Sequence, residues 1–371
     1  MKKRIISLIL ASIICITPMI SLGEEAAKNS IKTTISIEEA IEIGIKNSPE
    51  IKLNEVEIEI KKVEASEANY EERKHKKSDI SMGTVEEFLL DENMLSKKAG
   101  YALEEEKLKK NYIMEDIKYN VVNAYYGVLK AKEHINAVNS NLDNINRHRD
   151  IIKKKFDLGL VSKSELLITE IALNEANINL EKAKEDGEMA VRALNMVLNY
   201  PLNTKLNLTS SFKEESFSTD LDKDIENSYK KRFEMIQMKN NYEIVKLDFE
   251  TNAIVYPSNT FKYKYKEGSV LRMENLLNNA KQNAEFDIRG KYDAIKSAEK
   301  QIKLAKANVE KAEEGLRLKE ISYNVGKGTI LEVKEAMTQL YNAKLAVSDA
   351  IANYNLNIIQ YNKAVNIGSV R

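Results

Sequence analysis

The chain has 371 residues, of which 57 are basic and 57 acidic, and it contains 13 Gly, 4 Pro, one Cys and no Trp. So few chain-breaking residues exclude an all-β sandwich rich in tight turns, and a charged fraction of 31% excludes a polytopic helical membrane protein. Because the net charge is zero, nothing indicates nucleic-acid binding, and we expect a highly charged, mostly helical chain.

Residues 1–23 have the pattern of a secretory signal peptide. Three basic residues at 2–4 precede an apolar run at 5–20, which ends in small residues suited to cleavage. An uncleaved anchor helix is the alternative, but the run is short of the roughly 20 residues that span a bilayer. The single cysteine, Cys15, lies in this segment. We therefore expect an exported chain without disulfides.

The first helix after this segment is predicted to begin beyond Ser36. Ser36 and Glu39 have the spacing of a capping box, in which each side chain bonds to a backbone amide of the other residue. After a variable segment at 70–98, apolar residues recur at steps of three and four from Val121 to Ile145, as in the a/d seam of a coiled coil. The helix expected over 103–156 spans about 80 Å, more than a globular domain needs.

The second half of the chain repeats the first. At a shift of 167 residues, Val121 and Tyr125 align with Ile288 and Tyr292, and the register continues to Asn366. The N-terminal parts align at a shift of 184, so the second copy is 17 residues shorter between its first two helices. We expect repeat 1 over 35–200 and repeat 2 over 220–366, each a helix, a variable segment and a long helical hairpin, joined by a polar linker at 201–219.

Each predicted hairpin turns at a glycine. Gly159 and Gly326 each follow an aromatic residue and precede a hydroxyl residue by three positions, Ser162 in the first repeat and Thr329 in the second. Glycine tolerates the left-handed conformation that ends a helix, and the hydroxyl can cap the next one. These four residues mark the predicted hairpin tips.

No pattern in the chain indicates catalysis. His75, His134 and His148 are scattered, and we interpret them as solvated residues on helix faces rather than metal ligands. The run from Gly326 to Thr329 is faintly similar to a phosphate-binding loop, but the upstream glycine of that motif is missing, which favours a helix turn. We expect no enzyme, no cofactor and no metal.

Three features occur together over about 35–366. They are the opening segment from Ile35 to Ile51, two aromatic-x-x-Gly-x-x-Ser/Thr-x-x-Glu tips, and the closing segment from Tyr341 to Leu356. With them the chain resembles the TolC-type outer-membrane efflux family. The resemblance implies a homotrimer whose long hairpins close into a hollow, mainly all-α barrel. It also implies a passive channel across the envelope in a tripartite efflux or secretion system, located in the outer membrane or cell envelope. Its tips would dock on a periplasmic adaptor, and an inner-membrane transporter would supply the energy.

The segments in which this family carries membrane strands depart from the family pattern. A membrane strand needs about 9–11 residues of alternating apolar character. Residues 70–98 do not alternate, and 257–270 leaves room for one short strand, in which Phe261, Tyr263 and Tyr265 alternate with lysines. We expect short residual strands at most, either because the membrane strands are lost or because their sequences are degenerate.

The carboxylates beyond the tips suggest an aperture in such a trimer. Glu165 and Glu332 begin the returning helices, where negative charge suits the helix dipole. They would recur as acidic rings around the mouth, and Tyr323 could narrow it by bonding to a neighbouring tip carboxylate. The alternative is that both carboxylates only cap their helices.

Apolar residues outside the heptad seams indicate whether the helices meet further neighbours. A helix in a tubular wall contacts others on both sides, which would explain Ile113, Met114, Ile117, Val122, Tyr126, Leu129, Leu167, Ile168, Ile171 and Ile178. The alternative is packing within one four-helix bundle. The rival function is an exported coiled-coil spacer of the envelope without a pore.

Overall fold

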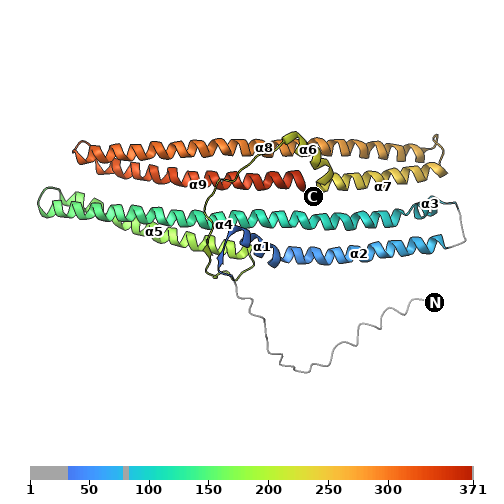
Figure 1. Ribbon diagram of the computed structural model, residues 1–371, viewed down its shortest axis with the longest axis horizontal. Coiled ribbons are helices and arrows are strands. Elements are labelled where there is room, and N and C mark those ends of the chain that lie inside the picture. The colour runs from blue at the N-terminus through green and yellow to red at the C-terminus, as the bar shows by residue number, and fades with distance from the viewer. Residues whose placement is uncertain (1–31, 78–82, 370–371) are drawn as a thin grey trace, which may run out of the picture. The chain divides into compact units, whose positions relative to one another are not determined.

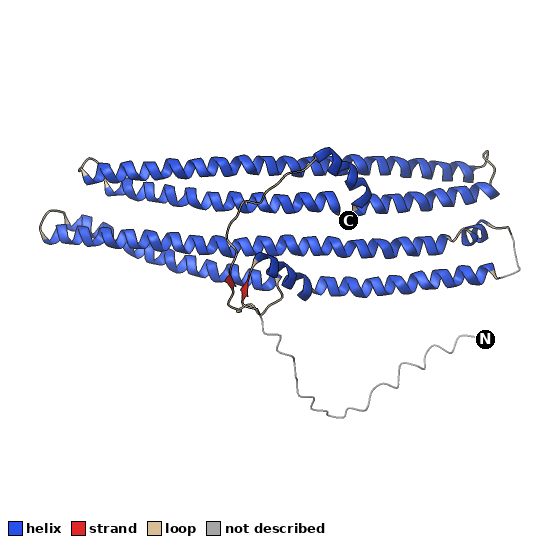
Figure 2. Cartoon of the chain, in the orientation of Figure 1, coloured by secondary structure: helices blue, strands red, loops and turns tan. Residues whose placement is uncertain are grey.

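The computed structural model describes residues 32–77 and 83–369, which form nine helices and one pair of two-residue strands (Figures 1 and 2). The helices are α1 (Ile37–Asn47), α2 (Pro49–Lys76), α3 (Val85–Asp91), α4 (Met94–Asp157), α5 (Lys163–Val197), α6 (Leu221–Lys231), α7 (Phe233–Val255), α8 (Phe261–Asn324) and α9 (Ile330–Asn366). The strands β1 (Thr34–Ile35) and β2 (Asn207–Leu208) pair in parallel. This confirms the mainly all-α fold of long helical hairpins with short residual strands. The predicted leader at 1–23 lies outside the described residues.

Two unbroken helices of 64 residues each, α4 and α8, are the longest elements. Each is about 95 Å long at 1.5 Å per residue, so the helix expected over 103–156 extends further at both ends. α4 runs beside α2 and α5, and α8 runs beside α7 and α9, the shorter helices following one another along the long one (Figure 1). The order of helices is thus similar in the two halves, while the repeat boundaries at 35–200, 201–219 and 220–366 stay a prediction.

Side-chain caps fix where several helices begin. Ser36 Oγ accepts a hydrogen bond from the Glu39 amide at 3.3 Å, and the Glu39 carboxylate accepts one from the Ser36 amide at 2.9 Å, which confirms the capping box. The Ser48 hydroxyl caps α2 by accepting from the Ile51 amide at 3.4 Å, with Pro49 at the first helical position. α2 therefore begins directly after α1 ends.

Residues 261–265 form the first turns of α8, so the short strand expected there is wrong. The Thr260 hydroxyl caps this helix by accepting from the Tyr263 amide at 3.3 Å. The Tyr263 ring packs edge-on against Phe249 of α7, with centroids 5.1 Å apart, while Phe261 and Tyr265 stay exposed. Five residues that alternate are too few to distinguish a strand from a helix whose partner lies far away in the sequence.

The predicted seams form the core. Ile288, Ile295 and Ile302 are fully buried in a cluster with residues of α9. Of the apolar residues outside the seam of α4, four are buried and two are partly buried within the chain, against α1, α5, α9 and the linker: Ile117, Val122, Tyr126, Leu129, Ile113 and Met114. For these six residues, the alternative interpretation, in which they pack within one polypeptide, is therefore the right one. Leu167, Ile168, Ile171 and Ile178 of α5 are instead exposed, by 46–69%.

Part of the linker crosses the helices as an extended strap, which we define as residues 209–219 (Figure 2). It begins beside Tyr125, a fully buried side chain of α4. The Tyr125 hydroxyl accepts from the Ser210 amide and donates to the Ile35 carbonyl, both at 3.1 Å. One phenol thus joins the strap to the segment that precedes α1.

The strap is then held by α9 and α8. The buried Asn355 side chain of α9 donates to the Lys213 carbonyl at 2.7 Å and accepts from the Glu215 amide at 3.1 Å. Lys306 of α8 pairs with Glu214 at 2.8 Å. The strap therefore covers one face of α4, α9 and α8.

Candidate functional site

The first hairpin tip has the geometry that its sequence predicts. Gly159 has φ +72°, and its amide donates to the Phe156 carbonyl at 2.8 Å. This left-handed residue ends α4, because a residue with a Cβ adopts that conformation only at a cost. Ser162 Oγ then accepts from the Glu165 amide at 3.2 Å and begins α5.

The second tip repeats this geometry with a stronger cap. Gly326 has φ +73°, and Thr329 and Glu332 form a complete capping box: Thr329 Oγ1 accepts from the Glu332 amide at 3.4 Å, and the Glu332 carboxylate accepts from the Thr329 amide at 2.9 Å. Lys319 of α8 also donates to Glu332 Oε1, at 3.1 Å. The backbone hydrogen bond from Thr329 and the Lys319 ammonium lower the pKa of the Glu332 carboxyl below its usual value.

The two carboxylates expected at the aperture therefore differ. Both oxygens of Glu332 are occupied within its own hairpin, one by Thr329 and one by Lys319. The Glu165 amide donates to Ser162 Oγ, whereas the Glu165 carboxylate makes no ion pair with the described residues. A negative charge that is free to act on a solute is thus better provided by Glu165 than by Glu332. The aperture role of both stays a prediction.

Tyr323 of α8 lies against α4 of the first hairpin. Its ring meets the His148 ring of α4 edge-on, with centroids 5.7 Å apart, and the His148 Nε2 atom is buried without a hydrogen-bond partner. Burial, together with the nearby Lys155 charge, lowers the pKa of His148, while Glu165 acts in the opposite direction. Interpretation of this histidine as a solvated residue is wrong, since it is packed between the two hairpins.

Polar contacts continue along the seam between α4 and α9. Lys130 pairs with Asp349 at 2.9 Å, and three further side-chain pairs join the two helices: His134 with Tyr341, Glu133 with Ser348, and Asp116 with Lys363. His134 thus also has a side-chain partner, and His75 lies 3.5 Å from Asp91, while both histidines stay partly exposed on their helices. Sequence reasoning missed this seam because its partners lie more than 200 residues apart. These polar pairs lie beside an apolar contact between the same two helices, where Ala352 and Leu356 of α9 pack in the cluster of α4.

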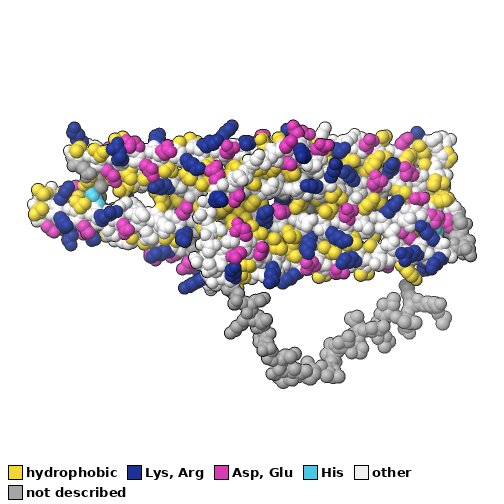
Figure 3. Space-filling model, in the orientation of Figure 1, with side chains coloured by type: hydrophobic (Ala, Val, Ile, Leu, Met, Phe, Trp, Pro, Cys, Tyr) yellow, Lys and Arg dark blue, Asp and Glu magenta, His cyan; other side chains and the backbone are white. Residues whose placement is uncertain are grey.

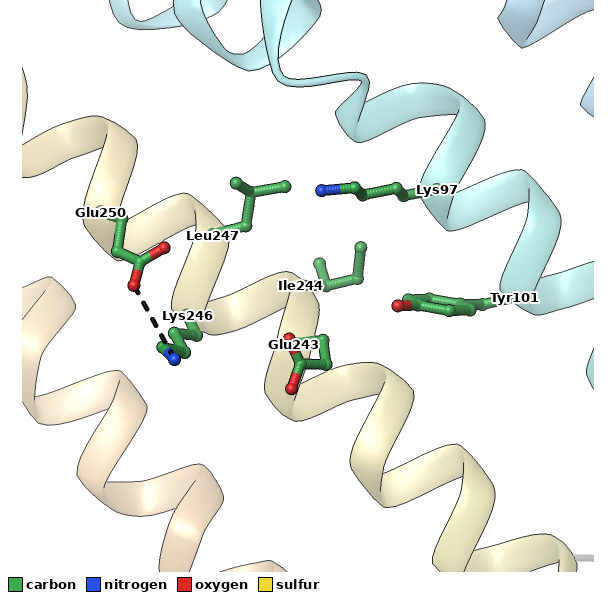
Figure 4. Close-up of a pocket in the computed structure, with 7 residues that line it drawn as sticks. All are labelled: Lys97, Tyr101, Glu243, Ile244, Lys246, Leu247 and Glu250. Atoms are coloured by element: carbon green, nitrogen blue, oxygen red, sulfur yellow. Dashed lines mark ion pairs between the residues drawn. The ribbon is translucent and has the colours of Figure 1, made fainter.

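A shallow pocket of about 120 Å³ lies between α4 and α7 (Figure 4). Lys97 and Tyr101 of α4 face Glu243, Ile244 and Leu247 of α7 across it, and Lys246 is paired with Glu250 at 3.9 Å on the same helix. No cluster of three or more His, Cys, Asp or Glu suited to a metal ion occurs within residues 32–77 and 83–369. In those same ranges no helix is both long and apolar enough to cross a membrane.

Charge of both signs is spread over the visible face of the molecule. In Figure 3, Lys and Arg side chains alternate with Asp and Glu along the helices, and hydrophobic side chains show between them. Such a mixed surface gives no single-sign field of the kind that attracts nucleic acid. The features that distinguish the molecule are the two tips and the polar seam behind them.

The comparisons with known proteins agree with this fold. The model of the outer membrane efflux protein family matches residues 258–365, which lie mainly in α8 and α9. No curated protein matches the chain. The match confirms the resemblance to the efflux family for this range.

Solved structures of similar fold cover most of the chain. A membrane protein from Pseudomonas aeruginosa is 10% identical over 90% of this chain and 90% of its own, with a TM-score of 0.68. The outer membrane protein VceC of Vibrio cholerae is 13% identical over 90% and 97%, with a TM-score of 0.67. The CmeC outer membrane channel of Campylobacter jejuni is 12% identical over 89% and 85%, with a TM-score of 0.66. The chain therefore shares its fold with these three proteins.

Proposed function

We propose that this chain is the channel subunit of a tripartite efflux or secretion system, exported to the outer membrane or cell envelope. In this proposal it is a homotrimer and a passive conduit. A periplasmic adaptor docks at Gly159, Ser162, Gly326 and Thr329, and an inner-membrane transporter supplies the energy. Support comes from the family match over 258–365 and from the fold shared with outer membrane channels.

The observation that carries the proposal is a wall of helices with two open edges. In one half of the wall α5 contacts α4, α4 contacts α9, and α9 contacts α8, so α5 and α8 stand at the edges. In the other half the order is α2, α4, α7 and α8, so α2 and α8 stand at the edges. The two edges are different surfaces. A contact between unlike edges is head-to-tail, and such contacts close into a ring when the rotation allows it.

Both edges carry apolar side chains that the chain itself leaves exposed. On α2 they have heptad spacing: Leu53, Val56, Ile60, Val63 and Tyr70, exposed by 45–71%. On α5, Ile168, Ile171 and Ile178 form a second exposed group, and α8 carries Phe261, Tyr265, Phe286 and Leu318. A heptad seam without a partner is typical of a helix that packs on another chain. Copies of this chain offer the complementary edge.

The aperture belongs to the same proposal. Glu165, Tyr323 and Glu332 lie at the tips, so three copies would bring them together around one mouth. Glu165 provides the free carboxylates of that ring, because Glu332 is engaged by Lys319 and Thr329. Cation selectivity at the mouth should then depend on Glu165 far more than on Glu332.

The test is the mass of the purified full chain in mild detergent, followed by conductance in planar bilayers. We expect a trimer, and we expect the triple substitution Ile168→Glu, Ile171→Glu and Ile178→Glu to reduce it to monomer, since each carboxylate would be buried at the contact. Leu202→Glu is the matched control, because Leu202 is 53% exposed in a loop. A folded, monodisperse monomer of the unaltered chain would refute the proposal and favour the envelope spacer.

A further inference from the structure

One face of α9 is free of charge although it is open to solvent. Its positions recur at steps of three and four over 22 residues: Gln339, Asn342, Ala346, Ala350, Asn353, Asn357 and Gln360. Four of the seven are exposed, and the other three are half-buried. Five of the seven carry side-chain amides. We call this set the amide stripe.

α8 continues the uncharged surface beside α9. Gly290, Ala294, Ser297, Gln301, Leu304 and Asn308 follow one another at the same helical spacing, and all but Ala294 are exposed. Together with the amide stripe they make thirteen positions without a charge. At the chain's charged fraction of 31%, about four of the thirteen would be Lys, Arg, Asp or Glu.

The two sets face the same side of the molecule. A hollow of about 400 Å³ is lined by α8 residues, by Ala350, Asn353 and Asn357 of the amide stripe, and by Tyr119 of α4. This face is therefore hollowed here, and Gln301, Asn353 and Asn357 are the amides among its lining residues.

The strap lies on the opposite face. Asn355, which holds the strap, is two residues from both Asn353 and Asn357, and two residues are a rotation of about 200° around a helix. On α8, Lys306 contacts the strap and is likewise about half a turn from Ser297 and Asn308 in projection. Strap and amide stripe are thus on the two sides of one wall.

α9 meets different neighbours on its different sides. One side packs on α4, one on α8, and one faces the strap and α6. Among the described residues the amide stripe is the remaining side, and it touches α8 at its border, where Asn357 donates to the Ala294 carbonyl at 3.4 Å and Gln360 accepts from Lys291 at 2.9 Å. It has no large apolar residue to bury against another copy. Its own side chains carry no charge; the charges at its border are Lys291, which donates to Gln360, and Asp349, which is paired with Lys130.

We propose that the amide stripe and the uncharged surface of α8 line the conduit and make its central section unselective for charge. This inference rests on the proposed function, because it needs a ring of copies that encloses this face. Charged rings in a pore select ions by sign, whereas amides and small residues offer hydrogen bonds without a net field. The section therefore suits uncharged, hydrogen-bonding solutes or large solutes of mixed charge, and any choice by charge is left to the tips.

The experiment labels single cysteines in the assembled full chain after Cys15→Ser substitution. The reporter is Asn357→Cys, probed with small cationic, anionic and neutral thiol reagents and with a maleimide on a 5-kDa polyethylene glycol. Asn362→Cys, exposed on the side away from the stripe, is the control. We expect the reporter to react with all three small reagents in the ratio shown by a free thiol, and to be protected from the polymer. The control should react with the polymer as well.

A charge placed in the stripe tests the electrostatic part. Asn353→Asp lies four residues from the reporter, so it should raise the cationic-to-anionic rate ratio about three- to tenfold at low salt. Asn362→Asp, five residues from the reporter on the other side of α9, should leave the ratio unchanged.

The outcomes separate this inference from the proposed function. If the chain is a trimer and the reporter still reacts with the polymer, the assembly stands and the lining is refuted. A trimer in which no small reagent reaches the reporter shows another surface packed on the stripe, which also refutes it. An unaltered reporter whose cationic and anionic rates differ more than tenfold from the free-thiol ratio refutes the lack of charge selection. A monomer by mass overturns both.

Discussion

Replacing Tyr125 by Phe removes a single oxygen atom from a ring that is fully buried. That oxygen makes two hydrogen bonds of 3.1 Å, one from the Ser210 amide in the strap and one to the Ile35 carbonyl in β1. A buried hydrogen bond contributes about 1 kcal/mol to stability, so the substitution should cost about 2 kcal/mol. The ring remains, so no cavity adds to this loss. Local opening of the strap should become about 30-fold more frequent, since 1.4 kcal/mol is a factor of ten.

Hydrogen–deuterium exchange of the full chain measures this opening directly. In Tyr125→Phe, the peptide containing Ser210 should exchange about 30-fold faster, and the peptide containing Ile35 should follow. Tyr292→Phe is the matched control, because Tyr292 occupies the equivalent position of the second half and its hydroxyl makes no hydrogen bond among the described residues. Unchanged exchange at Ser210, or an equal change in the control, would show that the phenol does not hold the strap.

Three further predictions concern the tip, a buried ion pair and pH. Gly326→Ala should destabilise its tip by about 1 kcal/mol because of the left-handed φ, seen as faster proteolysis there, while Gly100→Ala inside α4 should be neutral or stabilising. Arg232→Met should lower stability by about 3 kcal/mol in chemical denaturation, because Arg232 is 3% exposed and bonds to Glu234, Asp287 and the Ala364 carbonyl; a loss under 1 kcal/mol would contradict this. Burial lowers the pKa of His148, so folding favours its neutral ring. The contribution of this ring to stability is therefore complete above the unfolded pKa of 6.5 and is lost as the pH falls through the lowered pKa. Cross-linking between cysteines at the two tips should therefore weaken from pH 7.5 to pH 5 in the unaltered chain but not in His148→Gln, and equal behaviour of the two would refute the role of this ring.

Heptad spacing was enough to predict the long helices, and local chemistry was enough to predict the turns. The seam of Ile288, Ile295 and Ile302 and the left-handed Gly159 and Gly326 depend on neighbours within a few residues, so a single sequence contains the information. Phe261 to Tyr265 was predicted wrongly because its alternation is short and its cap, Thr260, was not weighed. Local propensity decides such a segment only together with its tertiary partner, here Phe249.

The surroundings of the tips could not be predicted in the same way. His148 contacts Tyr323, and Lys130 contacts Asp349, although the partners lie far apart in the sequence, where a periodic pattern of residues gives no information. The strap is a similar case, since its polar sequence predicts a linker but not the buried Asn355 that holds it. These contacts depend on how two hairpins are placed side by side, and that placement is a property of the whole fold.

The two 64-residue helices have a mechanical consequence. Their partners are interrupted at corresponding places, after α1 at Ser48 and after α6 at Arg232, whereas α4 and α8 pass these heights without a break. Each hairpin therefore bends more easily on the side of its interrupted helices than on the side of its continuous 64-residue helix, which acts as a rod. A sideways load applied near Gly159 or Gly326 should be carried by that rod as torque over about 95 Å. The two ends of α4 and of α8 can thus be coupled mechanically through the stiffness of these helices, without a rearrangement of their backbone.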